Sequence, residues 1–164
     1  MSWRTICAFA AGALLLAGRG GDNKPSTAPP SNDWQKADPC ALLTDAEAAT
    51  LLGVAQVTHA REDLAGIGPG CTWKATGADA SVGVLLNQPA NQDRDVQHAK
   101  RRVDVAGKPG YVQADDGNYR LIYVDGGPAW IQFSGRSAKK DVPKTYECDR
   151  SVPLPAKMVR TLGW

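Results

Sequence analysis

Hydrophobic and polar positions divide the chain into three stretches of different character. An uncharged, apolar run from residue 6 to residue 18 follows the basic residue Arg4. Residues 19–37 are rich in Gly, Pro, Ser, Asn and Asp, and Trp34 is their only large apolar side chain. From residue 38 onward, apolar residues recur at the spacings of helices and strands. The pattern predicts a leader (1–18), a flexible linker (19–37) and a single globular domain (38–164).

The apolar run predicts a signal peptide over residues 1–18. Its 13 residues are too few for a transmembrane helix, which needs about 20, but they suit the apolar region of a signal peptide. The polar stretch that follows cannot bury enough surface to fold, so it is expected to act as a tether. We therefore expect an exported protein, located in the periplasm or at the cell surface.

The end of the leader resembles a bacterial lipoprotein box. Leu16, Ala17 and Gly18 match the box, but Arg19 stands where the lipid-bearing cysteine belongs. Only a thiolate accepts the diacylglyceryl group, so the sequence predicts no lipid at this position. Membrane anchoring by a lipid would require Arg19→Cys.

The firmest local signal in the domain is a helix that begins after Thr44. Thr44 and Glu47 have the spacing of a capping box, and Gly53 is placed to end the helix in the left-handed conformation. The charge distribution over residues 91–103 predicts a second helix, and residues 155–162 predict a third. Strands are expected over 54–60, 70–75, 80–87, 119–125 and 129–134, and residues 103–113 are expected to form two strands around a turn. This order predicts an α+β fold, in which two or three helices pack on one face of an antiparallel, disulfide-stapled sheet.

The charge balance excludes some classes of partner. The 164 residues carry 19 basic and 17 acidic side chains, a formal net charge of +2. So small an excess gives no electrostatic footprint for nucleic acid or for anionic lipid. We therefore expect no nucleic-acid partner.

The cysteines indicate an oxidising compartment. Cys7 lies in the predicted leader, which leaves Cys40, Cys71 and Cys148 in the domain. Three cysteines allow three pairings, and at least one pair is expected after export. We favour Cys40 with Cys71, which joins the start of the first helix to a strand and leaves Cys148 as a free thiol. Pairing of Cys40 with Cys148 is the alternative.

Side chains that carry chemistry are scarce. His59 and His98 are the only histidines, and both are expected to be solvated surface residues. Neither lies in a zinc-binding spacing, and residues 115–118 lack the glutamate that closes a calcium loop. We therefore predict no catalytic residue, no metal and no cofactor. The enzyme alternative would have to use Cys148, or a histidine with an acidic partner.

The strand over residues 129–134 offers a candidate contact surface. Side chains alternate between the two faces of a strand, so Trp130 shares one face with Gln132 and Ser134 while Ile131 and Phe133 share the other. Trp130 would then be either an exposed aromatic anchor or a residue covered by a neighbouring element. Tyr123, in the preceding strand, is the second candidate anchor.

Four short motifs resemble a family of secreted actinobacterial lipoproteins of unknown function. They are Asp-Pro-Cys-Ala-Leu-Leu-Thr at 38–44, Gly-Cys-Thr-Trp at 70–73, Val-Asp-Val-Ala-Gly-Lys-Pro at 103–109 and Glu-Cys at 147–148. The likeness covers about residues 38–162. It implies a location in the cell envelope but no assigned reaction. Members often carry a further cysteine before the last hairpin, and residues 119–123 have none.

These observations favour a noncatalytic binding or accessory module of the cell envelope. Its partner would be an envelope protein or a cell-wall component, contacted through one sheet face and its loops. An inhibitor or immunity protein directed at an envelope hydrolase belongs to the same class. A small envelope enzyme is the alternative from a different class.

Overall fold

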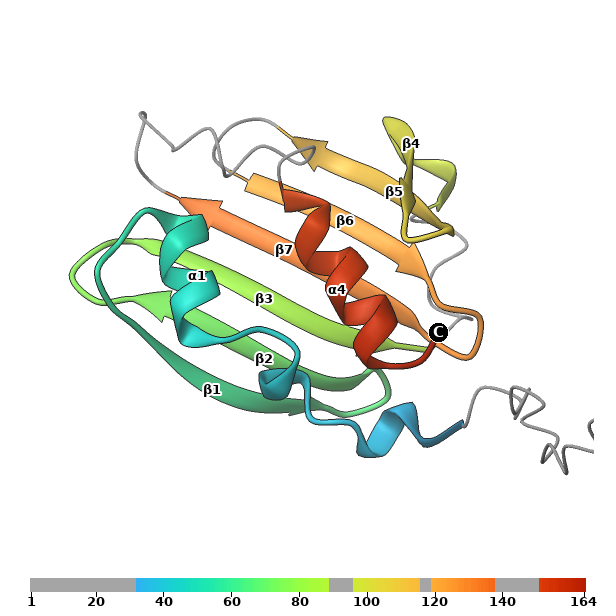
Figure 1. Cartoon of the computed structure of the whole chain (residues 1–164), viewed down its shortest axis with the longest axis horizontal. Helices are drawn as coiled ribbons and strands as arrows, with labels where there is room; N and C mark the ends of the chain where they lie inside the picture. The colour runs from blue at the N-terminus through green and yellow to red at the C-terminus, as the bar shows by residue number, and fades with distance from the viewer. Residues whose placement is uncertain (1–31, 89–95, 116–118, 138–150) are drawn as a thin grey trace, which may run out of the picture.

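Seven antiparallel strands form one sheet across the domain (Figure 1). The computed structural model describes residues 32–88, 96–115, 119–137 and 151–164. The strands are β1 (Val57–Leu64), β2 (Gly68–Ala75), β3 (Ala80–Asn87), β4 (Arg101–Val105), β5 (Lys108–Asp115), β6 (Tyr119–Asp125) and β7 (Trp130–Ser137). Their order in the sheet is β1-β2-β3-β7-β6-β5-β4, so two meanders join where β3 pairs with β7.

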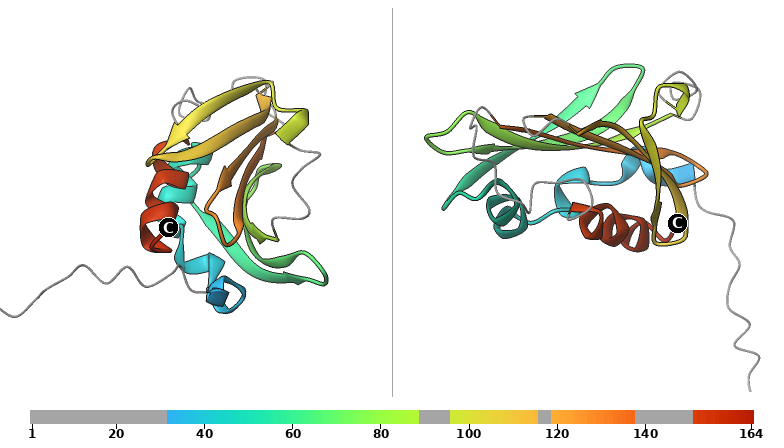
Figure 2. Two further views of the ribbon diagram at one scale, coloured as in Figure 1. Left: turned by 90° about the vertical axis from the view of Figure 1, so that its right-hand side faces the viewer. Right: turned by 90° about the horizontal axis from the view of Figure 1, so that it is seen from above.

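The described helices cover one face of this sheet. Two α-helices, α1 (Asp45–Leu52) and α4 (Pro153–Thr161), lie on the same side, as Figure 2 shows. Two short 3₁₀ turns, η1 (Asn32–Lys36) and η2 (Pro39–Ala41), precede α1. We call this side the helix face and the opposite side the distal face. No helix among the described residues is long and apolar enough to cross a membrane.

The expected α+β fold class is wrong, because the sheet dominates the molecule and the described residues contain only two short α-helices. The second helix was predicted too long at its C-terminal end: Val96 and Gln97 are helical, but Arg101 to Val103 belong to strand β4. Val105 is buried in the core, and Val103 packs against the same core. This two-residue alternation of β-branched side chains favours a strand there and outweighs the charge pattern that suggested a helix. Residues 91–95 of the expected helix lie outside the described residues.

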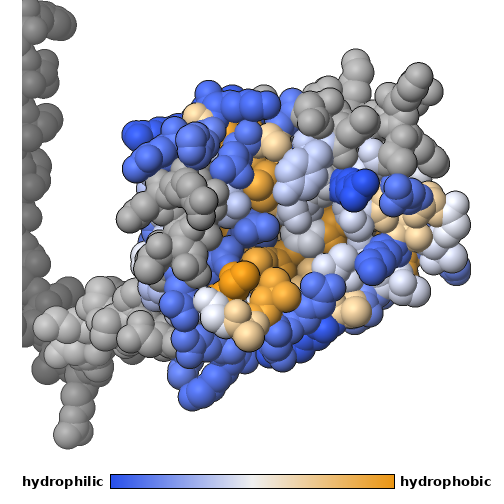
Figure 3. All heavy atoms as spheres, turned by 180° about the vertical axis from the view of Figure 1, so that it is seen from behind, coloured by the Kyte–Doolittle hydropathy of each residue, from blue (hydrophilic) through white to orange (hydrophobic). Residues whose placement is uncertain are grey.

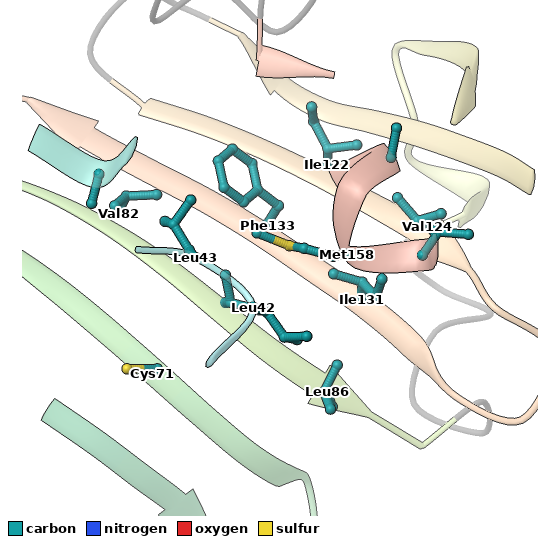
Figure 4. Close-up of a cluster of buried hydrophobic side chains, with 14 of the residues drawn as sticks. Leu42, Leu43, Cys71, Val82, Leu86, Ile122, Val124, Ile131, Phe133 and Met158 are labelled. Atoms are coloured by element: carbon teal, nitrogen blue, oxygen red, sulfur yellow. The ribbon is translucent and has the colours of Figure 1, made fainter. Parts of the chain in front are cut away.

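The main core fills the space between the helix face and the helices. Figure 4 shows side chains from β2, β3, β6 and β7 together with others from the loop after η2 and from α4. Phe133 and Met158 lie at its centre, with 1% and 0% of their surfaces exposed. Trp34, from the stretch expected to be a linker, also packs into this core.

A disulfide joins Cys40 to Cys71, the pairing that the sequence favoured, with 5.2 Å between the two Cα atoms. It ties η2 to β2, and so fixes the chain that leads into α1 against the sheet. Cys148 and the predicted leader, including Arg19, lie outside the described residues.

The capping box expected at the start of α1 is present. The Thr44 hydroxyl accepts a hydrogen bond from the Glu47 backbone N–H, and the Glu47 carboxylate accepts one from the Thr44 N–H. Lys157 of α4 donates to the same carboxylate at 2.7 Å. Burial raises the pKa of Glu47, but the hydrogen bonds from Lys157 and Thr44 outweigh it and hold the pKa below its ordinary value.

We expect Glu47→Gln to destabilise the protein by about 1 kcal/mol at neutral pH, because the amide can keep the capping hydrogen bond but loses the charge-assisted contact with Lys157 and the favourable negative charge at the start of α1. Because the folded pKa lies below the ordinary value of 4.5, the charged form contributes stability above that value and loses it as the pH falls through the folded pKa. Urea unfolding should therefore show a difference in the free energy of unfolding between the two proteins near neutral pH, and this difference should become smaller in acid. Glu62→Gln, at an exposed position of β1, is the control. A difference in the free energy of unfolding that stays the same in acid would contradict the lowered pKa of Glu47.

Candidate functional site

The two faces of β7 carry different kinds of side chain. Ile131 and Phe133 face the main core, whereas Trp130, Gln132 and Ser134 alternate with them and lie on the distal face. This is the alternation that the sequence indicated. The distal face is therefore the candidate contact surface.

Trp130 and Tyr123, the two candidate anchors, are buried and so are not exposed contact residues. Only 8% of Trp130 and 5% of Tyr123 is exposed. With Leu121 they form a second, smaller core on the distal face, against which Tyr111 packs. The Tyr111 and Trp130 ring centroids are 5.5 Å apart. Side chains of adjacent strands cover the rings, which is the second of the two alternatives that the sequence left open for Trp130. The alternation within one strand cannot show which alternative holds.

Strand register aligns two polar rows across the accessible part of the distal face. The first row runs from Lys74 through Ser81 to Arg136, and the second from Thr72 through Gly83 to Ser134. Lys74 and Arg136 are exposed, and the other four residues are partly exposed. We call these six residues the polar platform. Figure 3 views this side of the molecule, where hydrophilic surface surrounds an apolar patch.

Gly83 forms the floor of the polar platform. A Cβ atom at this position would lie 3.0 Å from the Ser134 Oγ and 3.8 Å from the Thr72 Oγ1. The two hydroxyls therefore stand on either side of a glycine, where a larger side chain would fill the space between them. The hydroxyl groups of Thr72 and Ser134 thus both lie near Gly83.

Two cations flank these hydroxyl groups. In the described part of the chain, neither Lys74 nor Arg136 forms an ion pair. Lys74 and Arg136 pair with Ser81 from opposite sides, so two strand spacings of about 4.8 Å put their Cα atoms about 10 Å apart. Tyr119 lies opposite Arg136, and burial raises the pKa of its phenol. Two cations with neighbouring hydroxyls are suited to phosphate or carboxylate groups.

A second polar cluster centres on Asp45, the first residue of α1. The His59 Nδ1 lies 2.7 Å from the Asp45 Oδ1, and the Trp73 Nε1 donates to the same oxygen at 3.1 Å. Sequence reasoning missed this contact and treated His59 as a solvated residue. Asp45 lies 14 residues from His59 and 28 residues from Trp73 in the sequence, so no local pattern marks these contacts.

The Asp45 cluster lacks the parts of a nucleophilic site. A carboxylate can orient a histidine as a base, but a nucleophile must then lie within hydrogen-bonding reach of the ring. No serine, threonine or cysteine among the described residues hydrogen-bonds to His59. His98 is exposed. The described residues also contain no group of three His, Cys, Asp or Glu side chains that could hold a metal ion.

An apolar pocket of about 440 Å³ lies at the tip of the β1–β2 hairpin. Trp34 and the turn residues Leu64 to Gly68 line it. Leu64 is 41% exposed and Ile67 is 38% exposed. Gln35, Asp63 and Gln88 also line it, but no cation among the described residues does, so it is less suited than the polar platform to an anionic ligand.

Fold and surface together define a small, disulfide-stapled antiparallel β domain whose accessible chemistry is suited to binding. The family model described as "Protein of unknown function (DUF3558)" matches residues 17–159, and the chain belongs to this family. No curated protein and no solved structure matches the chain. The family resemblance found in the sequence is thus confirmed at the level of a family of unknown function.

Proposed function

We propose that the protein is a noncatalytic binding module of the bacterial cell envelope and that it binds an anionic ligand through the polar platform. The observation that carries the proposal is the row in which Lys74 and Arg136 stand on either side of Ser81, both exposed and, within the part of the chain that the structure describes, in no ion pair. The ligand class is an envelope protein segment or cell-wall component that presents carboxylate or phosphate groups.

Two further observations support the envelope assignment. A disulfide between Cys40 and Cys71 suits an oxidising compartment outside the cytoplasm. The leader and tether proposed for residues 1–37 would deliver the domain to that compartment and hold it at a distance from the membrane. The secreted-lipoprotein character of the family, with Arg19 replacing the lipid-bearing cysteine, belongs to the same proposal.

The alternative of an envelope enzyme has less support. It needs a nucleophile beside His59 or an activated thiol at Cys148. The hydrogen bonds of His59 in the described residues lead only to Asp45, and Cys148 lies outside them. A histidine held by a carboxylate at the surface is also a common way to fix an edge strand against a helix.

We expect Lys74→Glu/Arg136→Glu to weaken binding of linear polyphosphate or poly-L-glutamate by at least about tenfold, because two attractive contacts become repulsive. Calorimetric titration at low salt measures the affinity, since salt screens such contacts. Uncharged dextran should not bind.

The matched control is Lys108→Glu/Arg160→Glu, which changes the net charge equally but lies away from the platform. Lys108 begins β5 and Arg160 lies in α4. Equal weakening in both variants would show a nonspecific charge effect. That outcome, or an absence of saturable binding by the unmodified protein, would contradict the proposal.

A further inference from the structure

Strand β1 presents an edge that is free to pair with another strand. It lies at the end of the sheet, and seven of its eight residues are exposed. Its pairing with β2 runs through eight residue pairs without a register shift. The described hydrogen bonds include no backbone partner for its outer edge.

Natural sheets usually protect such an edge with proline, a bulge, charged side chains or a covering element. Strand β1 has no proline and no positive φ angle, but it carries the charged residues Arg61, Glu62 and Asp63. The opposite edge strand, β4, has only five residues and contacts α4. Figure 1 shows β1 running along the border of the sheet, with α1 lying over the sheet rather than beyond this border. Within the described residues, charge is therefore the main protection of the β1 edge, and pairing there depends on which charges are opposed.

We propose that two copies of the chain associate by antiparallel pairing of their β1 strands. A two-fold axis perpendicular to the sheet would join seven strands from each copy into one continuous sheet. Such an interface is isologous, because each copy contributes the same surface. The distal faces of both copies would then point in the same direction.

The alternation of side chains restricts the register. His59 and Arg61 pair with Trp73 and Cys71, which belong to the main core, so these two side chains lie on the helix face. Opposed residues in a sheet share a face. One residue of β1 must therefore lie directly opposite its own copy at the two-fold axis, and the axis is named by that residue. Axes at Ala60 and Arg61, near the middle of β1, pair the most residues of the strand, whereas axes nearer its ends, such as His59 or Glu62, pair fewer.

Charge complementarity selects Ala60. An axis at Arg61 or Glu62 would place identical charges directly opposite each other, which is destabilising. An axis at Ala60 sets two methyl groups opposite each other and puts Arg61 opposite the partner's His59. The guanidinium of Arg61 then lies beside the partner's Asp45, whose carboxylate is bound to that histidine and is 54% exposed. Symmetry forms this contact twice.

Cysteine crosslinking tests the register directly, because a cysteine on the two-fold axis meets its own copy. The full-length chain carrying Cys7→Ser and Cys148→Ser provides the background. We expect Ala60→Cys to give a disulfide-linked dimer under mild oxidation. Asp79→Cys, in the exposed β2–β3 turn, is the matched control and should stay monomeric. Preferential crosslinking of Arg61→Cys or Glu62→Cys would overturn the Ala60 register.

Sedimentation of the unmodified chain tests the association itself. We expect a concentration-dependent dimer, and we expect Ala60→Lys to dissociate it because two ammonium groups would oppose each other at the axis. Ala60 is exposed, so the thermal transition of the Ala60→Lys monomer should show a folded domain. A monomer at every soluble concentration, or a dimer unaffected by Ala60→Lys, would overturn the proposal. Neither result bears on ligand binding at the polar platform.

Discussion

Replacing Trp130 with alanine is expected to lower the free energy of unfolding by about 3–5 kcal/mol, the usual cost of removing a large buried aromatic side chain. Trp130 is 92% buried, since only 8% of its surface is exposed. Its ring packs with Leu121 and Tyr123 in the smaller core, and Tyr111 adds an aromatic contact at 5.5 Å between centroids. Urea unfolding followed by circular dichroism measures the loss.

Leu64→Ala is the control for the Trp130 variant, because Leu64 is a large hydrophobic residue that is 41% exposed. Its loss should cost less than about 1 kcal/mol, as is usual for exposed sites. A Trp130→Ala protein as stable as the Leu64→Ala protein would show that the Trp130 ring is a surface group. The aromatic contact site expected from the sequence would then return as a candidate.

Removing the disulfide is expected to cost about 3–4 kcal/mol. The bond joins residues separated by 31 positions, and closing a loop of that length constrains the unfolded chain by this amount in the chain-entropy model. The comparison uses Cys40→Ala/Cys71→Ala in a Cys148→Ser background, with urea unfolding as the measurement. A reducing agent should destabilise the parent to the same extent and leave the double variant unchanged. If the reducing agent left the stability of the parent protein unchanged, this role of the disulfide would be contradicted.

Local signals in the sequence were sufficient for some elements and not for others. The start and end of α1 depend on Thr44, Glu47 and Gly53, which lie within one short segment, and all three behave as expected. The predicted second helix includes Val96 and Gln97, which are helical, but it was extended too far, because charges at the ends of a segment are weak evidence beside the core packing of Val103 and Val105. Helix propensity and dipole effects amount to tenths of a kcal/mol per residue, whereas burying a valine contributes more.

The sequence predicted which face of β7 carries the candidate site, but not which residues of the neighbouring strands complete it. Alternation along β7 placed Trp130, Gln132 and Ser134 together, but not the neighbours that bury Trp130. The platform row joins Lys74, Ser81 and Arg136 through register between strands that are far apart in the sequence. Such register is set by the whole sheet, so no local pattern shows that two cations lie on either side of Ser81.

Amide chemical-shift mapping by NMR during titration with polyphosphate tests the central proposal most directly. We expect the largest shifts at Thr72, Ser81, Ser134 and Arg136, which belong to the polar platform, and small shifts at the hairpin pocket and around Asp45. Shifts concentrated on the Leu64 to Gly68 turn or on His59 would contradict binding through the polar platform.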